Sequence, residues 1–153
     1  MIRLAQTTDA DAITALLIRS IRELCGPDYE NDEEILSLWC RNKTPENIRA
    51  WVDNPNNYFI VAENADVVAG TALLSNAGEV VVCYLLPEYI GRGFGKAMLD
   101  DLINRARALG LSKITLESTR TARSFYRHQG FQELGETECQ GSIPGFLMEY
   151  ALT

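Results

Sequence analysis

Hydrophobic residues recur every three to four positions across residues 9–25, which predicts an amphipathic helix with one buried stripe. Thr8 or Asp9 is suited to cap this helix, and Gly26-Pro27 is expected to end it. The alternation in residues 2–5 predicts a short strand in front of it.

Residues 28–52 combine helical spacing with many aromatic and carboxylate side chains. One short helix is expected around residues 35–39, and Thr44-Pro45 is typical of the start of another. Two interpretations stay open for this segment. It either packs its aromatic side chains on a sheet with the acids in solvent, or it forms a lid that faces a substrate.

The pattern changes to strands after residue 57, with residues 58–63 and 67–74 separated by the turn at Asn64-Ala65-Asp66. A third run, residues 79–86, is almost continuously apolar, as in a central strand buried on both faces. These runs predict an antiparallel meander.

A helix is expected over residues 94–109, with Gly110 as its C-terminal cap, and a strand over residues 113–117. The order strand, helix, strand implies parallel pairing through a right-handed crossover. A short helix and two strands complete the chain, at residues 122–129, 131–136 and 146–152. The fold class is therefore mixed α/β (α+β), with a mostly antiparallel sheet of six to seven strands, flanking helices and one parallel junction, in a single domain over residues 1–153.

Composition adds limits rather than a function. The chain has 46% hydrophobic and 23% charged residues and a net charge of −7, which argues against a nucleic-acid partner and is compatible with a cationic one. No apolar run approaches the ~20 residues of a membrane span, and the first residues lack a signal pattern, so a cytoplasmic location is expected. One histidine and four dispersed cysteines favour reduced thiols and no metal site.

Candidate chemistry begins at three alternating glycines, Gly91, Gly93 and Gly95, between an apolar strand and a helix. Such glycines leave backbone N–H groups uncovered at a helix N-terminus, which favours phosphate. A P-loop is excluded because Ile90 stands at the first glycine position and Ala97 at the hydroxyl position. A Rossmann fingerprint fails too, since neither starting glycine is followed by the required third glycine or alanine.

The run from Leu85 to Gly95 resembles motif A of the GNAT superfamily of N-acetyltransferases, which reads Gln/Arg-x-x-Gly-x-Gly/Ala after a strand that ends in Pro-Glu-Tyr. Ile90 stands where the family has Gln or Arg, so Arg92 or Lys96 would supply charge instead. A second run resembles the family's motif B, Ala-x-x-Phe-Tyr-x-x-x-Gly-Phe. Its matching residues are Ala122, Phe125, Tyr126, Gly130 and Phe131, with Thr119 at the position of a frequent Asn.

The resemblance implies transfer of an acetyl group from acetyl-CoA to an amine of a small molecule or peptide, by a monomer or homodimer without metal. Backbone N–H groups at the helix start would hold the pyrophosphate, and the strand edge would pair with the pantetheine amides. The expected cofactor-binding residues are Cys83, Leu85, Leu86, Ile90, Gly91, Arg92, Gly93, Phe94, Gly95, Lys96, Thr119 and Tyr126.

Tyr126 stands at the family's position for the acid that protonates the departing thiolate. A base is also required, because a protonated amine is not a nucleophile, and Glu79 and Glu117 are the candidates, with Glu30 or Glu34 reaching over the site as further options. His128 is interpreted as a solvated residue at a helix end. A covalent role for Cys83 is disfavoured because direct transfer is the family's usual route.

Two other functions remain open at this level. An acyl-CoA sensor with the same fold would bind the cofactor without turnover, and an interaction protein with a vestigial site would not bind it at all. The intact Tyr126 favours the enzyme, whereas the apolar Ile90 favours the sensor slightly.

Overall fold

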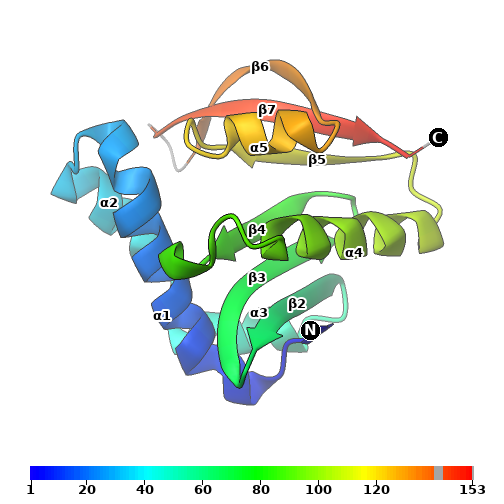
Figure 1. The fold of residues 1–153 in the computed structure, drawn as a ribbon, viewed down its shortest axis with the longest axis horizontal. Coiled ribbons are helices and arrows are strands. Elements are labelled where there is room, and N and C mark those ends of the chain that lie inside the picture. The colour runs from blue at the N-terminus through cyan, green and yellow to red at the C-terminus, as the bar shows by residue number, and fades with distance from the viewer. Residues whose placement is uncertain (140–142, 153) are drawn as a thin grey trace.

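Two antiparallel sheets meet at one end and diverge at the other, with the helix α4 (Phe94–Ala108) lying between them (Figure 1). This computed structural model describes residues 1–139 and 143–152. The first sheet has the strand order β1-β2-β3-β4, and the second has the order β5-β7-β6. The predicted mixed α/β class is confirmed.

The first sheet is the expected meander. Its strands are β1 (Ile2–Leu4), β2 (Asn57–Asn64), β3 (Val67–Ser75) and β4 (Val80–Leu85). The turn between β2 and β3 places Ala65 and Asp66 at positive φ (49° and 68°), as a tight hairpin requires. A register shift opposite Leu73 and Leu74 leaves Val81 as a bulge, and Val81 is 50% exposed. The prediction that this strand is buried on both faces is therefore wrong.

The second sheet consists of β5 (Lys113–Ser118), β6 (Gln132–Cys139) and β7 (Ile143–Ala151), with β7 in the middle. One central sheet was the expectation, but the two sheets share a single parallel bridge, Glu79 to Thr115. The N–H of Thr115 donates to the carbonyl of Gly78 at 2.8 Å, and a Cβ on Gly78 would lie 2.9 Å from the Lys113 carbonyl oxygen. The parallel junction thus exists, but it is confined to one end of β4 and β5.

Helices cover both faces of the first sheet. α1 (Ala10–Ser20) and α3 (Pro45–Asp53) pack on one face, and α4 packs on the other, where it meets α5 (Arg123–His128) and the second sheet in the main core. Met98, Leu102 and Ala106 form a fully buried stripe along α4, whereas Leu109, just after the helix, is 40% exposed. As expected, Gly110 follows α4 at a φ of +76°.

The end of the first helix differs from the prediction. After Ser20 the helix widens into a π-helical turn, Ile21–Cys25, and Gly26 opens a 3₁₀ turn, Gly26–Tyr29, rather than ending the helix. α2 (Glu33–Cys40) follows, capped by the Asp32 carboxylate. The predicted Thr44 cap of α3 is confirmed: its Oγ1 accepts from the N–H of Asn47 at 3.2 Å.

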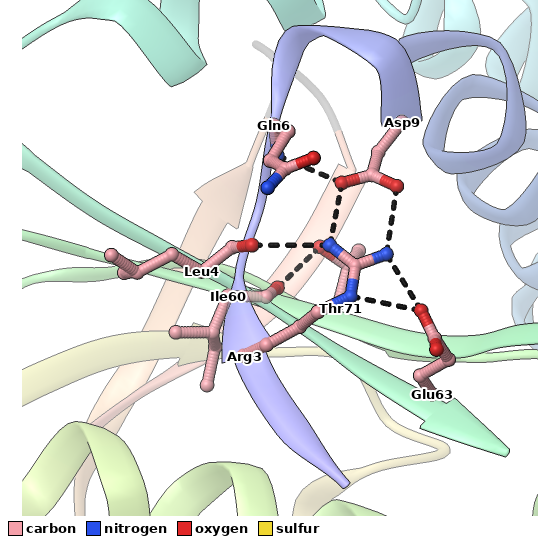
Figure 2. A network of polar contacts seen from close by, with 7 residues as sticks. All are labelled: Arg3, Leu4, Gln6, Asp9, Ile60, Glu63 and Thr71. Carbon is pink, nitrogen blue, oxygen red and sulfur yellow. Dashed lines mark hydrogen bonds and ion pairs between the residues drawn. The ribbon is translucent and has the colours of Figure 1, made fainter.

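Asp9 immediately precedes α1, but its carboxylate does not cap the helix. The Asp9 carboxylate accepts hydrogen bonds from both NH₂ groups of the Arg3 guanidinium at 2.9 Å and from the backbone N–H of Gln6 at 2.8 Å (Figure 2). Arg3 Nε donates a hydrogen bond to the Glu63 carboxylate at 2.8 Å. The hydrogen bonds from Arg3 hold the pKa of Asp9 below its usual range. This network fastens β1 and the start of α1 to β2.

We predict that Asp9→Asn lowers the free energy of unfolding at pH 7 by about 2 kcal/mol, because it removes a charge-assisted, largely buried hydrogen-bond pair. The pKa of Asp9 is depressed in the folded state, so the stabilisation is present above about pH 4 and is lost as the pH falls through the folded pKa. Urea unfolding at several pH values should show the deficit shrinking in acid.

The matched control is Glu46→Gln, which alters an exposed ion pair with Arg49 at 3.8 Å and should change stability by less than about 0.5 kcal/mol. A deficit for Asp9→Asn that stays constant from pH 7 to pH 3 contradicts the assignment.

Candidate functional site

The gap between the diverging strands β4 and β5 opens into a groove of about 330 Å³. It runs from the glycine loop along the β4 edge to the end of α1 and the loop between β5 and α5. Of the residues that the structure describes, those that line it are Ser20, Leu24, Cys25, Cys83, Tyr84, Leu85, Ile90, Gly91, Gly93, Gly95, Lys96, Met98, Thr119, Thr121, Ala122, Phe125 and Tyr126.

The glycine loop forms one end of the groove. Gly91 and Gly93 have φ values of +81° and +88°, and α4 starts directly after Gly93. Nothing lies within 4 Å of a Cβ built on either glycine, so these positions require glycine for their backbone conformation and not for lack of room. The loop presents uncovered N–H groups at the positive end of a 15-residue helix, an arrangement that binds anions.

Gly95 has a different requirement. A Cβ at this position would lie 3.2 Å from Phe125 Cζ, so the first turn of α4 touches the side chain of Phe125 on α5. This contact places the two sequence motifs side by side. It also fixes the distance between the anion site and the part of the groove around α5.

Three side chains of the loop point in different directions. Ile90, 52% exposed, and Lys96 line the groove, and Lys96 Nζ also pairs with Asp100 at 2.7 Å. Arg92 stacks its guanidinium over the Tyr89 ring at 5.0 Å and does not line the groove. Lys96 is therefore the cationic side chain of the loop that faces the groove in this structure.

Of the other residues expected around the cofactor, some line the groove and others do not. Cys83, Leu85 and Thr119 line the groove. Leu86 and Phe94 do not: the N–H of Leu86 donates to Ala69 on β3, and the Phe94 ring packs edge-on against Tyr89.

Tyr126 lines the groove from α5. It is only 6% exposed, and its ring packs against Phe125 and Phe131 at centroid distances of 5.3 and 5.5 Å. Its hydroxyl lies close enough to the Cys83 thiol on β4 for the two groups to influence each other's pKa. Burial, followed by the proximity of Cys83, raises the pKa of Tyr126 well above its usual value, so the phenol stays protonated.

Burial also raises the pKa of Cys83, and the nearby Tyr126 hydroxyl opposes that shift only in part. The Cys83 thiol is therefore not activated as a nucleophile, because nucleophilic attack needs the thiolate. This electrostatic setting agrees with the expectation of direct transfer.

A second, smaller pocket of about 40 Å³ lies between β4 and β5 on the other side of Tyr126. It shares Cys83, Tyr84, Thr119, Ala122 and Tyr126 with the groove and adds Val80, Val81, Leu116, Glu117 and Ser118. Tyr126 thus stands where a long groove and a short pocket meet.

Of the two carboxylates proposed as bases, Glu79 and Glu117, only Glu117 lines the small pocket. Glu117 is exposed near the C-terminal end of strand β5 and lines the pocket. Glu79 is exposed at the sheet junction and lines neither the pocket nor the groove. Glu30 and Glu34 are also exposed, and they too line neither cavity. His128 is exposed at the end of α5, as expected.

The sequence interpretation missed the wall that the first helix contributes. Ser20, at the end of α1, lines the groove together with Leu24 and Cys25 of the π-helical turn. The carbonyl of Leu24 accepts a hydrogen bond from Thr121 Oγ1 at 3.2 Å. No motif marks these residues, because their spacing is also that of an ordinary buried stripe. Tyr84, on the motif-bearing strand, was missed as well.

Within residues 1–139 and 143–152, no three His, Cys, Asp or Glu side chains gather closely enough to hold a metal ion. In the same part of the chain, no helix combines the length and apolarity needed to cross a membrane.

Comparison with known proteins identifies the family. Residues 27–152 match the acetyltransferase (GNAT) domain, so the chain belongs to the GNAT acetyltransferase family. An uncharacterized N-acetyltransferase of Mycobacterium tuberculosis is 26% identical over 132 residues, which are 82% of this chain and 84% of that protein. The amino-acid acetyltransferase of Azotobacter vinelandii is 37% identical over 82 residues, 51% of this chain but only 19% of that protein. The chain therefore spans about a fifth of the length of such relatives.

Solved structures share the fold. A GCN5-related N-acetyltransferase from Rhodopseudomonas palustris superposes with a TM-score of 0.86 at 23% identity, covering 99% of this chain and 94% of that one. The PaiA N-acetyltransferase from Thermoplasma acidophilum, solved in complex with coenzyme A, gives 0.84 at 23% identity, covering 99% and 98%.

We predict that Gly93→Val weakens acetyl-CoA binding at least about tenfold, because the valine distorts the left-handed backbone that aims the loop N–H groups. Gly110→Val is the matched control. Gly110 also has a positive φ and open space around a Cβ, but it lies at the opposite end of α4.

Both variants should lose roughly 1–3 kcal/mol of stability through backbone strain, and only Gly93→Val should lose affinity in isothermal titration. Unchanged affinity of Gly93→Val, or an equal loss in both variants, contradicts the placement of the anion site.

Proposed function

We propose that this protein is an acetyl-CoA-dependent N-acetyltransferase that transfers the acetyl group directly to an amine. One observation carries the proposal: a single groove joins an anion-binding helix start to a buried, protonated Tyr126, and a second pocket with a carboxylate opens beside the same tyrosine. Membership of the GNAT family and the coenzyme A in the PaiA structure support the choice of cofactor.

The cofactor would lie along the groove from the loop to Tyr126. The N–H groups of residues 91–96 would hold the pyrophosphate, and Lys96 would supply the positive charge that Ile90 cannot. β4 is paired with β3 on one side, and on the other its edge is open beyond the bridge at Glu79. That open edge can pair with the pantetheine amides as an added strand would.

Tyr126 would protonate the departing thiolate. The amine nitrogen attacks the thioester carbonyl carbon, the carbon–sulfur bond breaks, and the sulfur takes the Tyr126 proton, while the proton that the attacking nitrogen loses returns Tyr126 to its phenol form. The raised pKa of Tyr126 suits this step, because burial also disfavours a thiolate formed beside it, so the proton affinities of both groups rise together. Cys83 and Tyr126 both line the groove, so the cofactor sulfur would lie against both side chains.

Glu117 would accept the proton from the incoming ammonium. It lines the pocket that ends at Tyr126, whereas Glu79 lines neither cavity. An exposed carboxylate in a pocket open to solvent can pass that proton to water. The bulge at Val81 leaves strand backbone beside the pocket, where an N–H can stabilise the tetrahedral oxyanion.

We also propose an amine of a small molecule or peptide as the acceptor, and the monomer or homodimer expected from the sequence remains a prediction. A cytoplasmic location and the absence of a nucleic-acid partner remain predictions from the sequence.

We predict that the protein releases free thiol from acetyl-CoA when a panel of primary amines is supplied, and that Tyr126→Phe lowers kcat about a hundredfold while the Kd for acetyl-CoA changes by less than about threefold. The substitution removes only the hydroxyl, so the packing against Phe125 and Phe131 persists.

Tyr150→Phe makes the same chemical change on β7, where the ring packs against Phe131 and lines neither cavity, and should leave kcat unchanged. Binding of acetyl-CoA without thiol release for any amine favours the sensor over the enzyme. If Tyr126→Phe keeps full turnover, Tyr126 is not the acid, but the proposed acetyl transfer still stands.

The base is tested by a second pair. Glu117→Gln should lower kcat/KM for the amine about a hundredfold near neutral pH, because the ammonium loses its proton acceptor. Glu79→Gln, an equally exposed substitution outside the pocket, should have little effect on the same ratio. The reverse ranking of the two variants in steady-state kinetics assigns the base to Glu79 instead.

A further inference from the structure

The charge of the small pocket beside Tyr126 limits which amines can enter it. The pocket is lined by the acidic residue Glu117 and by four hydroxyl residues, Tyr84, Ser118, Thr119 and Tyr126, and no lysine or arginine is among its lining residues. An anionic group attached to the same carbon as the reacting nitrogen would therefore meet a negative charge and no cationic partner.

The cationic residues nearest in the chain to these lining residues do not line the pocket. Lys113, on the same strand as Glu117, pairs with Glu149 on β7 at 3.3 Å. Arg123 and Arg127 on α5 both pair with Glu133. Arg120, which follows Thr119, is exposed and does not line the pocket.

Two exposed apolar side chains lie near Glu117. Val81, in the bulge of β4, lines the pocket and is 50% exposed. Leu147, directly opposite Glu117 across the β5–β7 pair, is 37% exposed. Large apolar side chains in solvent beside a single carboxylate suit a ligand with one ammonium group and an apolar body.

The size of the pocket points the same way. Its volume is about 40 Å³, and because one water needs about 10–15 Å³ by this measure, it holds roughly three non-hydrogen atoms. That is room for an amino group and the carbon atoms next to it, so the rest of the acceptor would rest on the apolar rim.

We propose that the acceptor is a small primary amine with an apolar body and no carboxylate on the amino-bearing carbon, and therefore not a free α-amino acid. This inference rests on the proposed acetyl transfer at Tyr126 and deepens it. The proposed acceptor differs from the one suggested by the name of the amino-acid acetyltransferases, and this chain matches only about a fifth of the length of such a relative.

The test compares acceptors in groups of three that share one side chain. Phenethylamine, phenylalanine and phenylalanine amide form one group, and isoamylamine, leucine and leucinamide form the other. The amide keeps the branch of the amino acid but removes its negative charge. For each acceptor, kcat/KM is measured by thiol release from acetyl-CoA.

We expect kcat/KM at least about tenfold higher for the amine than for the amino acid, with the amide close to the amine. Val81→Lys, which places a cation in the pocket lining, should narrow the ratio of amine to amino acid relative to Val81→Met, a side chain of similar length without charge.

A preference for the amino acids contradicts this inference and leaves the proposed acetyl transfer intact. An amide with a kcat/KM as low as that of the amino acid also contradicts the inference, because the shape of the acceptor, and not its negative charge, would then prevent the reaction. Absence of thiol release with all six acceptors, while acetyl-CoA binds, contradicts the proposed function itself.

Discussion

The hydrogen bond from the N–H of Thr115 to the carbonyl of Gly78 is the constraint on which the rest of the site depends. It joins the two sheets at one end, together with the single bridge between Glu79 and Thr115. Gly78 combines a φ of +90° with a Cβ position only 2.9 Å from the Lys113 carbonyl oxygen, so both its conformation and its surroundings exclude a side chain. Beyond this point β4 and β5 diverge, and the gap between them becomes the groove.

Divergence alone would expose the core, and aromatic packing prevents this. Phe125 and Tyr126 fill the space between α4, α5 and β4, and Gly95 lets the first turn of α4 approach the Phe125 ring. The same packing removes Tyr126 from water and holds its hydroxyl near Cys83, which keeps the phenol protonated. The structural role of the aromatic cluster and the proposed chemical role of Tyr126 therefore have one cause, which is burial at the base of an open groove.

The sequence was sufficient wherever a local rule determines the conformation. The alternating glycines, the Thr44-Pro45 helix start and the stripe of α4 each depend on neighbours in the chain, and the structure has all three. The direction of individual loop side chains was beyond these rules. Arg92 turns to the Tyr89 ring while Lys96 faces the groove, and the sequence treats them as equivalent.

Features set by tertiary contacts were not predictable. The π-helical turn of residues 21–25 keeps the apolar spacing of an ordinary helix, yet it brings Leu24 and Cys25 to the groove. Likewise, Glu79 and Glu117 are both carboxylates near strand ends, and only the divergence of β4 and β5 places Glu117 in the pocket and leaves Glu79 outside it.

A crystal structure of the protein with coenzyme A tests the central claim most directly. The account predicts pyrophosphate oxygens on the N–H groups of residues 91–96 and the cofactor sulfur within hydrogen-bond distance of the Tyr126 hydroxyl. A cofactor whose sulfur lies away from Tyr126, or whose phosphates avoid the glycine loop, contradicts it.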